Sequence, residues 1–275
     1  MTTVSVIIPV YNRQDTVIRA LKSVVSQTFR DFELIVVDDG STDNTVKIIQ
    51  ASGIELNLIV HADNYGVSAA RNTGILKANS NLIAFLDSDD YWLPHKLQEQ
   101  VNFFKENIHA VACQTKEKWI RNDKQVNPGL RHIKSGGNIF LKSLDLCYIS
   151  PSAIMIRRSV FDRIGLFDES LNVCEDYDLW LRLTSGHEVY LLDTDGLVRI
   201  GSRTDQLSSK YSGMDSFRIF AASKLYRNLE ENFIYKDSVL KTIGKKGQIY
   251  SSGCLKRSRV AESGFYSKLV SILSQ

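Results

Sequence analysis

Two aspartates separated by one serine are the residues of this sequence best suited to bind a divalent cation. An apolar run over residues 82–86 leads directly into Asp87, Ser88 and Asp89. In an extended chain, residues two apart project to the same side, so the two carboxylates can face one ligand. Carboxylates this close raise each other's proton affinity unless a cation lies beside them, and their hard oxygens suit Mg²⁺ or Mn²⁺. The alternative is that these acids only cap the next helix.

A second pair of acids begins a segment whose apolar residues recur at helical spacing. Glu175 and Asp176 are adjacent, so on a helix they point about 100° apart and cannot share one role. Acids are also favoured in the first turn of a helix by the macrodipole. The pair alone is therefore consistent with a purely structural role.

The elements that must position these acids are predicted as alternating strands and helices over the first 115 residues. Apolar runs predict strands at residues 4–8, 32–37, 56–60, 82–86 and 110–113. Helical spacing predicts helices at residues 17–25, 46–49 and 67–76, and a further one beginning near Pro94. Continuous apolar runs are typical of strands buried on both faces, so the sequence predicts a mostly parallel sheet flanked by helices.

Polar side chains follow three of these strands, where a parallel α/β sheet binds its ligands. Tyr11 and Asn12 follow the first strand, Asp38 and Asp39 the second, and the Asp87–Asp89 pair the fourth. This convergence predicts a nucleotide site at the carboxyl edge of the sheet.

Other folds that use similar residues do not fit. An EF-hand loop beginning at Asp87 would need glycine and glutamate where Trp92 and Gln98 stand. A dinucleotide-binding fold would need a glycine-rich turn after the first strand, but no glycine precedes Gly40. An aspartyl-phosphate phosphatase places its acid pair on the first strand, which here ends in Pro9 and Val10.

Composition and charge describe a globular chain with a basic end. The 275 residues are 43% hydrophobic, and four scattered cysteines suggest reduced thiols in a cytoplasmic protein. No run of about 18 apolar residues occurs, and the first ten residues predict a strand, not a signal peptide. Residues 206–275 carry 12 Lys/Arg against 5 Asp/Glu, a net charge of +7, whereas residues 1–205 carry −4. The basic end either contacts phosphate-bearing surfaces and anionic lipid or only solvates helix faces.

Five segments, in this order, resemble the motifs of family 2 glycosyltransferases, with bacterial surface-polysaccharide enzymes as the nearest resemblance. The segments are residues 6–12, 36–43, 64–74, 85–90 and 175–182. The resemblance implies a GT-A fold over residues 1–205, with a nucleotide-binding half at 1–115 and an acceptor half at 116–205. A basic helical segment at 206–275 follows.

The resemblance also implies a role for most of the residues at the strand ends. Asp39 would recognise the base, usually uracil, and Pro9, Tyr11 and Asn12 would frame the base and ribose. Arg71 would lie near the diphosphate, where a planar cation pairs well with anionic oxygens.

The acids complete the implied site. Asp87 would face the ribose or the metal, with Ser88 beside it, and Asp89 would bind Mn²⁺ or Mg²⁺. Asp176 would be the catalytic base, with Glu175 as the second candidate, and Asp90 has no assigned role. The implied reaction is inverting, metal-dependent transfer of one sugar from a nucleotide-sugar, with a UDP-sugar favoured. The acceptor would be a hydroxyl of a glycan or lipid-linked glycan.

Two rival functions are weighed against this hexosyltransferase reaction. A sugar nucleotidyltransferase would need a glycine-rich first loop, which is missing. A non-catalytic nucleotide-sugar-binding protein would be expected to lose the base, yet Glu175 and Asp176 are present. No nucleic-acid partner is expected.

Two departures from the family pattern matter. Residues 196–209 contain no histidine to contact the metal or diphosphate, and either Arg203 or Asp205 could replace it. A Q-x-x-R-W segment is absent, which predicts one sugar transferred per encounter.

Three further expectations concern the rest of the chain. Residues 116–134 are predicted to form a mobile loop. Ser150 and Ser152 either contact an acceptor or cap a turn. The last segment could dock at the cytoplasmic face of the membrane, form a homodimer contact, or close the catalytic domain.

Overall fold

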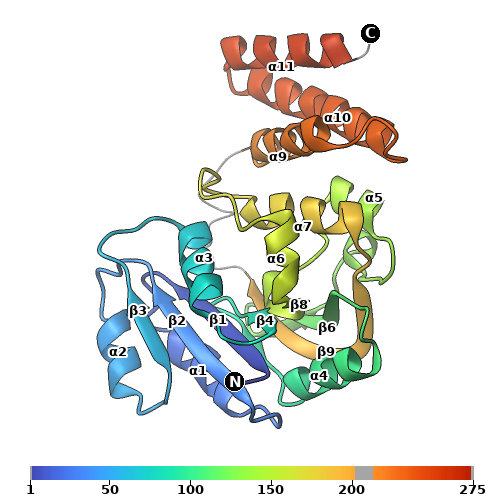
Figure 1. Cartoon of the computed structure of the whole chain (residues 1–275). Helices are drawn as coiled ribbons and strands as arrows, with labels where there is room; N and C mark the ends of the chain where they lie inside the picture. The colour runs from blue at the N-terminus through green and yellow to red at the C-terminus, as the bar shows by residue number, and fades with distance from the viewer. Residues whose placement is uncertain (1, 202–212, 274–275) are drawn as a thin grey trace.

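The computed structural model describes residues 2–201 and 213–273 as a layered α/β structure extended by helices at its C-terminal end (Figure 1). The strands are β1 (Val4–Val10), β2 (Phe32–Asp38), β3 (Asn57–Val60), β4 (Leu82–Phe85), β5 (Tyr91–Trp92), β6 (Ala112–Arg121), β7 (Lys124–Val126), β8 (Ile154–Arg157) and β9 (Tyr190–Gly201). The helices of the first half are α1 (Val17–Val25), α2 (Thr45–Ala51), α3 (Val67–Lys77) and α4 (Lys96–Glu106). Those of the second half are α5 (Phe140–Asp145), α6 (Phe161–Ile164), α7 (Glu175–Gly186), α9 (Asp215–Asn228), α10 (Lys236–Lys256) and α11 (Val260–Leu273), with short 3₁₀ turns at Leu130–His132, Pro151–Ala153 and Arg158–Val160.

The strands form one mixed sheet in the order β3-β2-β1-β4-β8-β6-β9-β5, with β7 paired to β6. Strands β3, β2, β1 and β4 are mutually parallel, and β8 joins β4 in the antiparallel direction. The predicted, mostly parallel sheet flanked by helices is therefore confirmed. Its parallel half brings the carboxyl ends of β1, β2 and β4 to one edge.

Helices cover both faces of this sheet. One apolar cluster packs α1, α2 and α4 against the sheet, and a second packs α3, α6 and α7 against the other face. Helix α3 approaches β1 very closely, because a Cβ on Gly74 would lie 2.4 Å from Cγ2 of Ile7. This approach fixes where the neighbouring turn of α3, which carries Arg71, stands relative to the strand ends.

The C-terminal helices continue from helix α7. A third apolar cluster joins Tyr177 and Leu181 of α7 to Ile219, Ala222 and Leu225 of α9, and it extends into α10. Figure 1 shows α9, α10 and α11 stacked beyond α7, with the chain end far from the sheet. Within residues 2–201 and 213–273, no helix has the length and apolar character needed to cross a membrane.

Two local predictions are wrong. Residues 116–134 contain a hairpin rather than a mobile loop: β6 and β7 pair through a turn in which Asn122 and Asp123 have φ of 49° and 57°. Two consecutive positive φ values define the type I′ turn that suits a two-residue hairpin, and Asn and Asp tolerate it. The polar strand β6 also pairs along its length with β9.

The second wrong prediction concerns Asp87 to Asp89. These residues are not extended but lie in a tight turn, which is closed by a hydrogen bond of 3.0 Å from Asp90 N–H to the Asp87 carbonyl.

Candidate active site

The acidic turn after β4 is held by Asp90, to which the sequence assigned no role, and by Ser152, which was expected either to contact an acceptor or to cap a turn. Ser152 accepts a hydrogen bond from Asp87 N–H and donates one to the Asp90 carboxylate, both at 3.0 Å, and Ile200 N–H donates to the same carboxylate at 3.1 Å. Burial, together with the charges of Asp89 and Asp87, raises the pKa of Asp90 well above its ordinary value. Asp90 and Ser152 thus anchor the turn, so that Asp87 and Asp89 remain half-buried at the strand end while Ser88 is buried.

Arg71 joins this turn to the helix that carries the second acid pair. Its guanidinium Nη2 lies 2.8 Å from the Asp87 carboxylate and Nη1 lies 2.7 Å from Glu175. The guanidinium also stacks over the ring of Phe167, 5.2 Å from its centroid. Although burial acts against it, the two carboxylates raise the pKa of Arg71. One buried cation of α3 therefore links the turn after β4 to the first turn of α7.

Glu175 and Asp176 have different surroundings. Glu175 is buried against Arg71, and burial together with the Asp176 charge raises its pKa to about 7 despite that cation. Asp176 is more exposed and lines a cavity of about 300 Å³. Its carboxylate accepts hydrogen bonds from Tyr177 N–H at 2.7 Å and from the Cys147 thiol at 3.1 Å. Burial and the Asp176 charge raise the pKa of Cys147, so the thiol is a neutral donor at pH 7. Of the two acids, Asp176 is the one that faces open space.

The residues predicted to hold the nucleotide lie at the ends of β1 and β2. Asp39 accepts hydrogen bonds from Gly66 N–H at 2.7 Å and Tyr65 N–H at 3.0 Å, and it pairs with His61 Nδ1 at 2.8 Å. Asp39 thereby orders the loop that precedes α3, and its Oδ2 keeps acceptor capacity for a ligand. The sequence reasoning did not foresee His61 in this position.

The other predicted nucleotide residues stand around the end of β1. Pro9 lies within the strand opposite Val37, and Tyr11 is 37% exposed. Asn12 has a φ of 50°, and its side-chain oxygen accepts a hydrogen bond from Thr42 N–H at 2.8 Å. The ends of β1 and β2 are therefore tied together beside an exposed aromatic ring.

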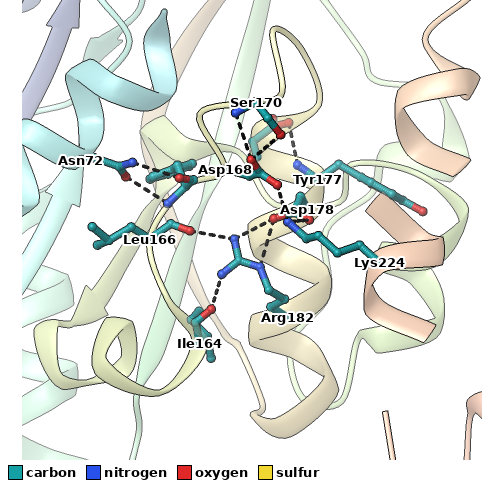
Figure 2. Close-up of polar contacts among 11 residues, drawn as sticks. Asn72, Ile164, Leu166, Asp168, Ser170, Tyr177, Asp178, Arg182 and Lys224 are labelled. Atoms are coloured by element: carbon teal, nitrogen blue, oxygen red, sulfur yellow. Dashed lines mark hydrogen bonds and ion pairs between the residues drawn. The ribbon is translucent and has the colours of Figure 1, made fainter. Parts of the chain in front are cut away.

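The loop over residues 165–170, which follows α6, lies between α3 and α7 and is clamped from both (Figure 2). Asn72 of α3 holds both backbone groups of Phe167, accepting from its N–H at 3.0 Å and donating to its carbonyl at 2.9 Å. Arg182 of α7 donates to the carbonyls of Ile164 and Leu166. These clamps set the position of Phe167 beneath the Arg71 guanidinium.

The same network fastens the C-terminal segment to α7. Lys224 of α9 lies 2.6 Å from Asp168 and 2.7 Å from Asp178, whose side chain is 1% exposed and also pairs with Arg182 at 2.7 Å. Helix α9 thus has polar as well as apolar contacts to the helix that carries Asp176 (Figure 2).

Replacing Lys224 by methionine is expected to lower the free energy of unfolding by about 1–3 kcal/mol, because a buried carboxylate loses one of two cations. Lys245→Met is the matched control, since Lys245 is 69% exposed and lies 3.8 Å from its partner Asp145.

The same ion pair makes the stability depend on pH. Burial alone would raise the pKa of Asp168, but hydrogen bonds from Lys224 and Ser170 lower this pKa to about 2. The charge of Asp168 therefore stabilises the fold above its unfolded pKa of about 3.9, and this contribution is lost as the pH falls towards 2.

The measurement is denaturant unfolding of both variants at several pH values. The difference between wild type and Lys224→Met should narrow between about pH 4 and pH 2. Equal stability of the Lys224 and Lys245 variants at pH 7 would contradict the role given to this network.

The acidic turn is chemically suited to a divalent ion that is completed by a ligand. Among the described residues, no group of three or more His, Cys, Asp or Glu side chains is placed to hold a metal. Asp87 and Asp89 supply two half-exposed carboxylates, and Mg²⁺ in proteins often takes one or two carboxylates plus substrate phosphates and water. The residues present therefore fit an ion bound jointly with a diphosphate. Arg203 and Asp205 lie outside the described residues.

Comparisons with known proteins show the family of the chain. The family model described as glycosyl transferase family 2 matches residues 5–165. An uncharacterized glycosyltransferase of Rickettsia felis is 35% identical over 218 residues, which are 77% of this chain but only 35% of that protein. The chain thus spans about a third of the length of that relative. The glucosyltransferase WfaP of Escherichia coli, named for transfer from UDP-Glc to alpha-D-GlcNAc-diphosphoundecaprenol, is 32% identical over 90% of this chain and 88% of its own.

A solved structure extends the comparison to the fold. The crystal structure of S. aureus TarS 1–349 in complex with UDP-GlcNAc superposes with a TM-score of 0.72 at 23% identity, over 91% of this chain and 73% of that one.

Proposed function

The chain belongs to glycosyltransferase family 2, and from that membership we propose that it transfers a single sugar from a UDP-sugar to a hydroxyl of a lipid-linked glycan, with inversion and with Mn²⁺ or Mg²⁺. The observation that carries the proposal is the Arg71 bridge, which joins the acidic turn to the first turn of α7, where Asp176 lines a cavity. The names of WfaP and the similar E. coli enzyme WfgD support UDP-glucose as donor and a GlcNAc diphospholipid as acceptor.

In the proposed reaction, Asp176 accepts the proton of the acceptor hydroxyl while that oxygen bonds to the anomeric carbon from the face opposite the leaving group. One carboxylate acting in a single displacement inverts the configuration. The Cys147 thiol and Tyr177 N–H fix the orientation of this carboxylate towards the cavity.

The donor is proposed to lie across the ends of β1, β2 and β4. Asp39 and the ring of Tyr11 would receive the uracil, and Asp87, held by Arg71, would face the ribose. When bound at Asp89, a divalent ion would neutralise the charge that develops on the departing diphosphate. Arg71 keeps the donor and acceptor sides at a fixed separation, which a reaction between two bound substrates requires.

The test is a transfer screen with UDP-, GDP- and dTDP-sugars, each with Mn²⁺, Mg²⁺ or EDTA, and with synthetic N-acetylglucosaminyl diphospho-undecyl as acceptor. Mass spectrometry should show the acceptor heavier by one hexose with a UDP-sugar and a metal, and not with EDTA. Full transfer in EDTA would overturn the metal requirement, and transfer only from GDP- or dTDP-sugars would overturn the donor assignment.

A further inference from the structure

The cavity beside Asp176 carries more positive charge than the chemistry of the base requires. Its only acidic lining residue among those described is Asp176 itself. Basic side chains line it from three directions: Arg121 and Arg199 from β6 and β9, His132 and Lys134 from the chain before α5, and Arg218 from α9. Such a lining is complementary to an anionic ligand.

Three of these five basic groups are accounted for without a further ligand. Arg199 lies over the Trp119 ring, 5.6 Å from its centroid, and although burial acts against it, the acids Asp90, Glu117 and Asp87 raise its pKa, so acids of this chain already balance its charge. Lys134 is largely buried, donates to the Tyr148 carbonyl and lies 3.5 Å from Glu117.

His132 is the third group that needs no anion. Burial and the neighbouring cation Lys134 lower its pKa, so the ring is neutral at pH 7. Among the basic lining residues, Arg121 and Arg218 remain.

Arg121 and Arg218 keep unused hydrogen-bonding capacity. Within the described residues, Arg121 makes no ion pair, and its guanidinium stacks against Trp119, 5.7 Å from the ring centroid. Arg218 pairs only with Asp215 at 3.2 Å, and its Nε is buried with no partner in the described structure. A buried guanidinium donor without an acceptor costs free energy, and an anionic oxygen in the cavity would satisfy it.

An apolar groove of about 360 Å³ adjoins this cavity and shares Leu146 with it. Leu130, Ile133 and Leu141 line the groove and are 86%, 56% and 49% exposed. Of the two cations in its wall, Arg131 is paired with Asp145 at 2.7 Å, and Lys142 donates to the Ser135 hydroxyl at 2.7 Å and lies over the Tyr148 ring. Three exposed aliphatic side chains around one hollow mark a place for an apolar ligand.

We infer that Arg121 and Arg218 bind the diphosphate of a polyprenyl-diphosphate-linked acceptor, whose first isoprene units occupy the groove of Leu130, Ile133 and Leu141. This inference rests on the proposed function. Such an acceptor consists of sugar, diphosphate and lipid in that order. The protein offers a base and two guanidinium groups with unused donors in one cavity, and an apolar groove that shares Leu146 with that cavity. The α9 helix, through Arg218, is then part of the acceptor site.

The first test compares two acceptors that differ only in the diphosphate: N-acetylglucosaminyl diphospho-undecyl and undecyl N-acetylglucosaminide. Arg121→Gln and Arg218→Gln should each raise KM for the diphosphate acceptor by about 10- to 100-fold, the range expected for hydrogen bonds to a charged group. KM for the neutral acceptor and the Kd for UDP should stay at the wild-type values. Arg158→Gln is the control, because Arg158 is exposed in the 3₁₀ turn after β8 and lines neither the cavity nor the groove.

The second test varies the lipid. A Leu130→Gln/Ile133→Gln double variant should raise KM for the undecyl diphosphate acceptor by roughly tenfold, but not for the methyl diphosphate analogue. Equal effects of the arginine variants on charged and neutral acceptors would overturn the diphosphate site. Equal effects of the double variant on long and short chains would overturn the groove. If wild type transfers sugar to no acceptor, the proposed function itself fails, which is a different result.

Discussion

Replacing Asp176 by asparagine is expected to lower kcat by about 100- to 10,000-fold, the usual contribution of a general base. The carboxamide has nearly the same shape and can still accept the hydrogen bond from Tyr177 N–H, but it cannot take a proton from the acceptor hydroxyl. Within the described residues, the Asp176 carboxylate accepts hydrogen bonds from the Cys147 thiol and Tyr177 N–H and from none of the strand ends proposed to bind the nucleotide, so the Kd for UDP should not change. Calorimetric titration with UDP and single-turnover transfer on the same preparation measure the two effects.

Glu175→Gln is the matched control for this experiment. Its carbonyl oxygen can still accept the hydrogen bond from Arg71, so the bridge to Asp87 is kept in a weaker form. We expect a smaller loss of kcat than for Asp176→Asn. Normal turnover by Asp176→Asn with a large loss in Glu175→Gln would show that the two acids have been assigned the wrong way round.

Replacing Asp89 by alanine is expected to weaken donor binding in Mn²⁺ by about 100-fold or more, since a metal ion contributes several kcal/mol of charge stabilisation. Asp90 and Ser152 anchor the turn without using the Asp89 carboxylate, so the turn should keep its shape. A difference in donor binding between wild type and Asp89→Ala therefore measures the loss of the carboxylate charge and not a change in the fold.

The control for Asp89→Ala is the ion itself. Fluorescence or calorimetric titration in Mn²⁺ should give a higher Kd for UDP in the variant than in wild type. In EDTA the two proteins should have the same Kd for UDP. Equal affinities in Mn²⁺ would contradict the assignment of Asp89 as the metal ligand.

The parallel half of the fold could be predicted because its signals are local. Apolar runs such as residues 4–8 and 82–86 mark strands buried on both faces, and a parallel sheet must bring their carboxyl ends to one edge. The positions of Asp39 and Asp87 at that edge follow from these two facts. The family resemblance then supplied the roles.

The polar part of the sheet could not be predicted in the same way. Strand β6 has mixed polarity beyond Thr115, and its pairing with β9 joins residues more than seventy positions apart. Asn122 and Asp123 were a usable signal for the hairpin, since both residues tolerate positive φ, but their flanks lack apolar alternation.

The partners within the site were also out of reach of sequence patterns. Arg71 reaches Glu175 across 104 positions, and Asp90 is held by Ser152 across 62. The net positive charge of residues 206–275 was interpreted either as contact with phosphate-bearing surfaces and anionic lipid or as solvation of helix faces. In the structure, Lys224 and Arg218 of that segment instead point to α7 and to the cavity of Asp176. Charge composition does not specify which face of a helix carries the charge.

The most direct test of single displacement with Asp176 as the base is the configuration of the product. Proton NMR of a reaction with UDP-glucose and the diphospho-undecyl acceptor would report the anomeric coupling of the new linkage as it forms. Because the glucose of UDP-glucose is α-linked, we predict a β-linked product from the first turnover onward. An α-linked product would contradict a single displacement with one catalytic carboxylate.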